Sequence, residues 1–191
     1  LGVARDTAPG RRIVGVDPAF TLALLQRLAL GRFGGRKAIG AGAGHGCIGG
    51  FDGAAHDPQL FEKIPDALAA LRPISICALN GSVYGGATDL VLACDLRVGL
   101  AGTELRMPAT ALGLHYYPSG LQRFVARLGI NGAKRAFLTA RPFSAERLLH
   151  MDCLEELAPN PEAFDQAVAR LVHDVARLAP LAVQATKQSL D

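Results

Sequence analysis

The feature that most constrains the fold is a pair of glycines, Gly85 and Gly86, placed between an apolar run and a helix-compatible run. The apolar run, from Ile74 to Leu79, contains neither glycine nor proline and is typical of a buried strand. Asn80 and Gly81 interrupt it, and the residues after the glycine pair (ATDLVLAC) suit a helix. The sequence therefore predicts a strand, a glycine turn and a helix, the connection that α/β folds repeat.

This turn is expected to expose backbone at the start of a helix. The first N–H groups of a helix have no acceptor within it and carry partial positive charge. Because Gly85 and Gly86 have no side chain, an oxygen atom of another molecule can come close to them. Asp89 follows one turn further along. We therefore expect a site that binds a developing oxyanion.

Apolar periodicity predicts the remaining elements. Helices are expected over 18–30, 58–71, 118–128, 133–139 and 160–178, from residue 180 onward, and starting at Ser144. Extended segments are expected at 37–41, 95–100 and 104–107. Strands and helices alternate before Pro118 and helices follow it, so we predict an α/β core with a helical C-terminal region.

Composition argues against several classes of protein. The chain has 191 residues, 50% hydrophobic and 19% charged, enough to bury the core of one domain and a small appendage. The formal net charge is +3 without a long Lys/Arg run, so no nucleic-acid partner is expected. No apolar run has the length of a membrane span, and we expect a cytoplasmic protein without a membrane partner. The 4 cysteines are far apart, which favours buried free thiols.

A glycine-rich stretch from Gly40 to Gly53 allows two interpretations. Gly44, Gly46 and Gly49 satisfy the G-x-G-x-x-G pattern of dinucleotide sites, which would make the protein an NAD-dependent oxidoreductase. That site also needs a helix to begin at once, and the glycines that follow oppose one. The favoured interpretation is a tight turn that presents N–H groups near Phe51.

Three separated motifs resemble one known family and occur in its order. The segment RPISICALNGSVYGGATDLVLACDLRV, at 72–98, resembles the signature of the crotonase (enoyl-CoA hydratase/isomerase) superfamily. CIGGFD, at 47–52, resembles its first oxyanion motif, and FLTARPFSAERLLHMDCLEEL is similar to a stretch of its later region. The segment GSVYGGA is also similar to the methylmalonyl-CoA decarboxylase branch. The resemblance covers most of 72–191, whereas 1–35 matches poorly.

The resemblance implies a fold and a substrate class. The fold would be a crotonase-type ββα spiral, with the core and an acyl-CoA site in 1–128 and a helical oligomerisation region in 129–191. The protein would be an enzyme of fatty acid metabolism that binds an acyl-CoA thioester and stabilises its enolate. It would form a homotrimer or homohexamer. Neither a metal nor a cofactor is implied beyond the coenzyme A of the substrate.

The resemblance also assigns roles by position. The backbone N–H groups of Phe51 and Gly86 would donate to the thioester oxygen. Hydratases of the family use two glutamates, and the matching positions here hold Asp89 and Ala109. Because Ala109 has no proton to give, two-carboxylate hydration is disfavoured, and isomerisation or decarboxylation is expected instead.

Tyrosines offer a substitute for the missing carboxylate. Tyr116 matches a tyrosine of the decarboxylase branch, and it would bind a carboxylate or deliver a proton to the enolate. The expected catalytic side chains are therefore Asp89 and Tyr116. Other residues are expected to line the substrate pocket: Tyr84, Gly85, Ala109 and Tyr117.

Alternatives stay open at this stage. Asp89 could cap its own helix, and the two neighbouring tyrosines could form a packing pair. Ala109 is also compatible with a non-catalytic acyl-CoA-binding paralogue. The chain begins at Leu1, and relatives extend past the position of Asp191 and have a longer loop at 53–59. We therefore expect that segments of the whole protein are missing from this sequence.

Overall fold

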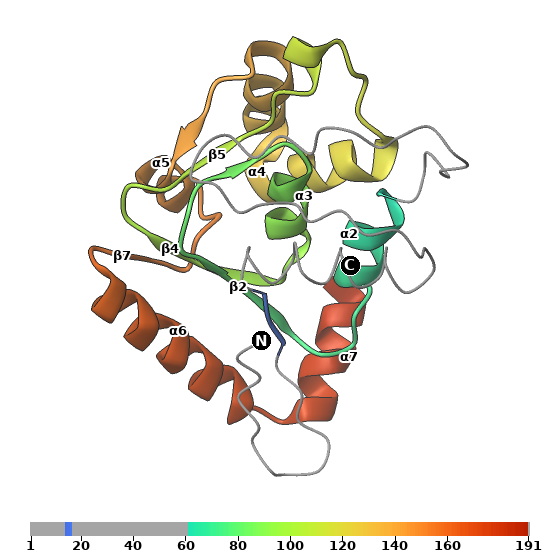
Figure 1. The fold of residues 1–191 in the computed structure, drawn as a ribbon. Helices are drawn as coiled ribbons and strands as arrows, with labels where there is room; N and C mark the ends of the chain where they lie inside the picture. Colours follow the sequence, from blue (N-terminus) through green and yellow to red (C-terminus); the bar gives the residue numbers. More distant parts are fainter. Residues whose placement is uncertain (1–13, 17–60, 191) are drawn as a thin grey trace, which may run out of the picture.

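The computed structural model describes residues 14–16 and 61–190 (Figure 1). The glycine-rich stretch with its candidate dinucleotide site, the predicted oxyanion donor Phe51, and the elements expected over 18–30 and 37–41 lie outside these residues.

The described residues form an α/β fold. Its elements in chain order are β1 (Val14–Val16), α2 (Lys63–Ala69), β2 (Ser75–Leu79), β3 (Val83–Tyr84), α3 (Gly86–Ala93), β4 (Leu96–Leu100), β5 (Glu104–Arg106), the 3₁₀ turn η1 (Thr110–Leu112), α4 (Pro118–Thr139), β6 (Phe143–Ser144), α5 (Ala145–His150), β7 (Glu156–Ala158), α6 (Pro161–Ala176) and α7 (Pro180–Leu190).

Two small sheets organise these elements. The first has the order β1-β2-β4-β7, and every neighbouring pair in it is parallel. Parallel neighbours need long crossover connections, and the helices supply them. The second sheet has the order β3-β5-β6, with β5 and β6 antiparallel. The central strand β2 is buried over most of its length, as its apolar run predicted.

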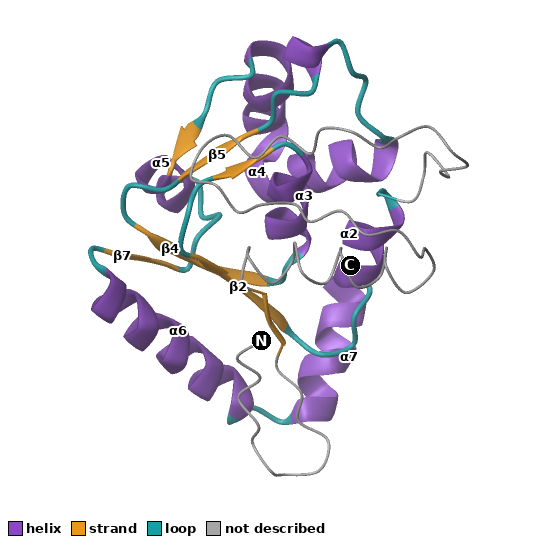
Figure 2. Cartoon of the chain, in the orientation of Figure 1, coloured by secondary structure: helices purple, strands orange, loops and turns teal. Residues whose placement is uncertain are grey.

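Helices cover the sheets on different sides (Figures 1 and 2). Helix α6 contacts β4 and β7, and Phe164 and Ala167 of α6 share a core cluster with Val98 and Ala158 of those strands. Helix α3 contacts both α2 and α4, so it is enclosed by helices on two sides. This packing makes α3, with the glycine turn at its start, the innermost helix of the described fold.

Local sequence signals explain where the later helices begin. Asn160 caps α6, since its side chain accepts a hydrogen bond from the Ala163 N–H at 2.8 Å, and Pro161 stands at the first helical position. Ser144 caps α5 in the same way through the Arg147 N–H. These two predicted starts are confirmed.

Helix α4 differs from its prediction in an informative way. Gly129 has φ 68° and ψ 166°, a conformation that favours glycine, and it interrupts the helix at the predicted position. The second helical segment continues directly after the interruption instead of starting at residue 133. Of the predicted helix 58–71, residues 58–60 lie outside the described ones; within 61–71 the helix α2 covers Lys63–Ala69, with Pro65 buried in its first turn, where a missing N–H costs little.

Four short strands were not predicted. β1, β3, β6 and β7 each contain two or three residues, too few for an alternating pattern to be visible. The prediction of buried free thiols is confirmed for Cys77, Cys94 and Cys153. Among the described helices, none is both long and apolar enough to cross a membrane.

Candidate active site

The start of α3 is built by backbone contacts with the second sheet. Gly85 precedes the helix with φ 61° and ψ −132°, a conformation that a residue with a side chain rarely adopts. Its N–H donates to the Arg106 carbonyl of β5 at 2.9 Å. Gly86 is the first helical residue, so no carbonyl of α3 can accept its N–H. The predicted exposed backbone donor is thus at the start of a helix anchored to β5.

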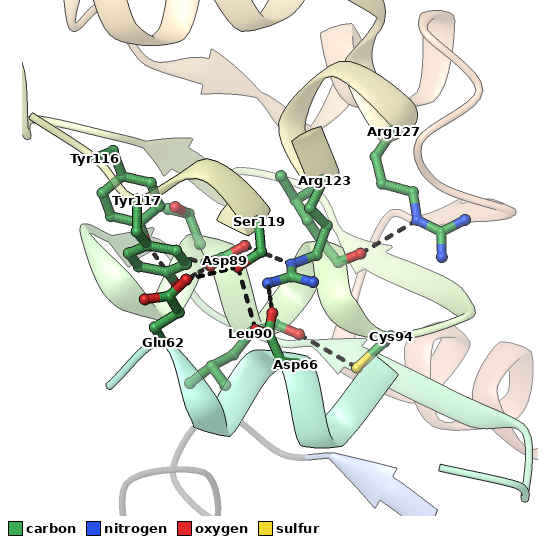
Figure 3. Close-up of polar contacts among 12 residues, drawn as sticks. Glu62, Asp66, Asp89, Leu90, Cys94, Tyr116, Tyr117, Ser119, Arg123 and Arg127 are labelled. Atoms are coloured by element: carbon green, nitrogen blue, oxygen red, sulfur yellow. Dashed lines mark hydrogen bonds and ion pairs between the residues drawn. The ribbon is translucent and has the colours of Figure 1, made fainter. Parts of the chain in front are cut away.

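Asp89, on the first turn of α3, has 0% of its surface exposed. Its Oδ1 accepts a hydrogen bond from Arg123 Nε at 2.8 Å. Its Oδ2 accepts hydrogen bonds from the hydroxyls of Tyr117 and, at 3.3 Å, Tyr116 (Figure 3). Both carboxylate oxygens therefore face side chains of another segment, and no helix-capping bond from Asp89 accounts for its burial.

Arg123 extends this contact to helix α2. Its Nη2 donates to Asp66 Oδ1 at 2.9 Å, so one guanidinium bridges a buried and a half-exposed carboxylate. Ser119 donates to Asp66 Oδ2 at 3.2 Å on the same side (Figure 3). We call Asp89, Arg123 and Asp66 the carboxylate bridge. It ties together α2, α3 and α4 around the predicted catalytic carboxylate.

The two tyrosine rings form a stack beside the carboxylate bridge. Their centroids are 4.3 Å apart with 29° between the planes, and the Tyr116 ring also contacts Phe137 at 5.5 Å. Gly120 makes the stack possible, because a Cβ there would overlap the Tyr116 ring and lie 2.8 Å from Tyr117 Cε2. The stacked rings thus direct two hydroxyls at one carboxylate oxygen.

The environment keeps the acidic protons of the tyrosines in place. Burial raises the pKa of Tyr116 above its ordinary value, and the negative charge of Asp89 raises it further. Burial and the hydrogen bond to Asp89 raise the pKa of Tyr117 in the same direction. Burial alone would lower the pKa of Arg123, but its hydrogen bonds to Asp89 and Asp66 outweigh that effect and raise it. The site therefore contains two neutral phenols and one permanent cation at neutral pH.

These pKa shifts predict how stability depends on pH. A folded-state pKa above the unfolded value favours the neutral phenol in the folded protein. This contribution is complete below the unfolded pKa of about 10 and is lost as the pH rises above it. We expect the urea unfolding free energy to fall as the pH rises above about 10, and to fall less in a Tyr116→Phe/Tyr117→Phe variant. Equal falls in both proteins would contradict the assignment.

Other predicted site residues have different surroundings. Tyr84 is 37% exposed, and its hydroxyl donates to Glu104 Oε1 at 2.8 Å on the second sheet. Ala109 is 5% exposed and belongs to the main apolar core cluster, and its carbonyl accepts the Leu114 N–H. The structure thus brings together Gly86, Asp89 and both predicted tyrosines of the 116–117 pair, and it leaves Tyr84 at the surface.

Arg123 is the residue that sequence reasoning missed. The signal was present in α3, where Asp89 interrupts an otherwise apolar helix that must be buried. A buried carboxylate needs a hydrogen-bonded cation nearby. The available arginines at 123 and 127 were visible on the helix after Pro118. Within the described ranges, no group of three or more His, Cys, Asp or Glu side chains is placed to hold a metal ion.

Comparison with known sequences gives a consistent result. The family model described as enoyl-CoA hydratase/isomerase matches residues 46–191. The chain is 27% identical over 142 residues to methylmalonyl-CoA decarboxylase of Escherichia coli (strain K12), covering 74% of this chain and 54% of that protein. It is 29% identical over 133 residues to 2,3-dehydroadipyl-CoA hydratase of the same organism, covering 70% and 50%. The chain spans about half the length of these relatives.

Solved structures agree with the sequence matches. An enoyl-CoA hydratase from Bacillus anthracis superposes with a TM-score of 0.64 at 26% identity, covering 68% of this chain and 50% of that one. The crystal structure of a methylmalonyl-CoA decarboxylase superposes with a TM-score of 0.65 at 25% identity, covering 68% and 51%. The fold is therefore of the crotonase type, as predicted. Since the family model covers well over half of the sequence, the chain belongs to the enoyl-CoA hydratase/isomerase family of the crotonase superfamily.

Proposed function

We propose that this chain carries the acyl-CoA site of an enzyme that stabilises a thioester enolate, and that the reaction is a decarboxylation. Relatives named as hydratases and as a decarboxylase support the substrate class. The choice of reaction depends on one observation, which is that the Asp89 carboxylate is fully buried and engaged on both oxygens.

Hydration fits this arrangement poorly. Adding water across a double bond needs one group to orient and deprotonate the water and another to deliver a proton. Ala109 stands at the position of one of those groups and has neither function. Asp89, at the other, would have to release Arg123 or the tyrosines before it accepts a proton. Isomerisation meets the same obstacle, since it begins with a base that removes a proton from carbon.

Decarboxylation needs no base. As the bond between the α-carbon and the substrate carboxylate breaks, its electron pair moves toward the thioester carbonyl, CO₂ leaves, and an enolate forms. The Gly86 N–H at the start of α3 is the described candidate donor to the enolate oxygen, a contact worth ~3 kcal/mol in related sites. Phe51, the second predicted donor, lies outside the described residues.

The tyrosine pair then supplies the proton. An enolate carbon is a stronger base than a phenolate, so transfer from a tyrosine hydroxyl is downhill even where the phenol pKa is raised. The resulting phenolate recovers a proton from water, which completes the cycle with CO₂ and the shortened acyl-CoA as products. The hydroxyl that gives its proton to the carbon turns away from Asp89 Oδ2, while the other hydroxyl and Arg123 stay hydrogen-bonded to the carboxylate.

A second candidate is a non-catalytic acyl-CoA-binding protein, which Ala109 and the engaged Asp89 also favour. One experiment separates the options. Purified protein is incubated in parallel with methylmalonyl-CoA, a 3-enoyl-CoA and crotonyl-CoA, and the thioester products are separated by chromatography. We expect conversion of the malonyl-type thioester alone. Rapid hydration of crotonyl-CoA would contradict the proposal, and binding measured by calorimetry without turnover of any thioester would favour the second candidate.

A further inference from the structure

The geometry points to Phe61 as the residue that limits acyl size, so that the site accepts thioesters with a short acyl group and excludes long chains. This inference rests on the proposed acyl-CoA site, and it concerns a residue that neither the sequence motifs nor the tyrosine pair brought to attention. Three observations on the described residues carry it.

The first observation is the contact between Phe61 and Gly86. A Cβ built on Gly86 would overlap Phe61 Cζ and lie 2.9 Å and 3.0 Å from Cε2 and Cε1. The phenyl ring thus occupies the space that a side chain at position 86 would fill. Because the Gly86 N–H is bonded to the same α-carbon, the ring lies directly beside the candidate oxyanion donor.

The second observation links the same ring to the proton donors. The Phe61 and Tyr117 ring centroids are 6.3 Å apart with an angle of 62°, an edge-to-face contact. Tyr117 in turn donates its hydroxyl to Asp89. A thioester with its oxygen at Gly86 and its α-carbon within reach of Tyr117 must place that carbon between these two groups. Substituents on the carbon therefore meet the phenyl ring.

The third observation is that Phe61 is held in place. Its carbonyl accepts the Ile64 N–H at 3.1 Å where α2 begins, and Asp66 in the same helix is bound by Arg123. Helix α2 also contacts α3. Phe61 as a whole is half-buried. The backbone that carries the ring is thus fixed, and the ring itself is held by its contacts with Gly86 and Tyr117.

These observations define the substrate class more closely than the family does. A malonyl-type thioester whose α-carbon carries hydrogen or a methyl group fits beside the ring. A longer chain on that carbon would have to displace Phe61 from Gly86, at the cost of their packing contact.

The test measures binding and so does not depend on turnover. Acetyl-, butyryl- and octanoyl-CoA are titrated into the wild-type protein, Phe61→Ala, Phe61→Leu and the control Leu71→Ala by calorimetry. Leu71 is 36% exposed and lies just beyond the other end of α2. We expect octanoyl-CoA to bind the wild type and Leu71→Ala at least about tenfold more weakly than acetyl-CoA, a difference readily resolved by this method.

Phe61→Ala is expected to remove that difference, and Phe61→Leu to reduce it. Phe61→Leu keeps most of the packing volume and carries the test if Phe61→Ala does not fold. Equal binding of all chains by the wild type, or an unchanged preference in the Phe61 variants, would overturn the inference and leave the proposed function standing. Absence of binding for every acyl-CoA would overturn both.

Discussion

Replacement of Arg123 by leucine is expected to lower the free energy of unfolding by about 3–5 kcal/mol. Asp89 is completely buried, and Arg123 is its cationic partner in the described site. Removing the guanidinium leaves a carboxylate out of water that has, among the described residues, only the tyrosine hydroxyls as side-chain donors, and Asp66 loses its ion pair as well. Urea denaturation followed by circular dichroism measures the change.

Two further variants show whether the effect comes from the buried charge. Asp89→Asn combined with Arg123→Leu should be clearly more stable than the sum of the two single changes predicts, since the double variant has no unpaired charge at this position. Arg170→Leu is the matched control, because Arg170 forms an exposed ion pair with Glu156 at 2.7 Å. That control should cost less than about 1 kcal/mol. An Arg123→Leu protein as stable as Arg170→Leu would refute the carboxylate bridge as a stabilising element.

Replacement of both Tyr116 and Tyr117 by phenylalanine is expected to reduce kcat for decarboxylation about 100-fold or more, the usual contribution of a positioned general acid. Both tyrosines are replaced together because both hydroxyls donate to the same oxygen of Asp89. When one hydroxyl is removed, the other can still deliver protons in part. The rings themselves are retained, together with their stack and their contact to Phe137. Binding of acyl-CoA should therefore change little.

The single variants identify the hydroxyl that delivers the proton. We expect Tyr117→Phe to have the larger effect, because the Tyr117 ring is the one that contacts Phe61 beside Gly86. Rates are measured as CO₂ release at saturating thioester, with acyl-CoA affinity measured separately by calorimetry. A double variant that retains the wild-type rate would exclude the tyrosines as proton donors, and a loss confined to affinity would assign them to binding alone.

The parts of the fold that follow from local rules could be predicted from the sequence. The apolar run ending at Leu79, the glycine turn and the helix beginning at Gly86 were all placed correctly, because strand periodicity and glycine chemistry act over a few residues. Strand β7 could not be placed. Its three residues are held in the sheet by pairing with β4, and that pairing depends on the whole chain between them.

The candidate site likewise has parts that could be predicted from the sequence and parts that could not. Asp89 and the tyrosine pair were candidates because of their distance along the chain from the glycine turn and their resemblance to a family motif. The carboxylate bridge was invisible, because its members come from three helices and meet only after those helices have packed. The role of Gly120 was hidden for the same reason, as its small size matters only against the two rings above it.

The ion pair between Lys187 of α7 and Asp95 has a consequence for synthesis of the protein. The two residues are 92 positions apart, and their side chains are 8% and 14% exposed. Asp95 also accepts hydrogen bonds from the N–H and hydroxyl of Ser75 at the start of β2. During synthesis, the Asp95 carboxylate can pair with Lys187 only after α7 has left the ribosomal exit tunnel. The parallel strands β2 and β4 can pair earlier, but the nascent chain gains this neutralised contact only after α7 has emerged.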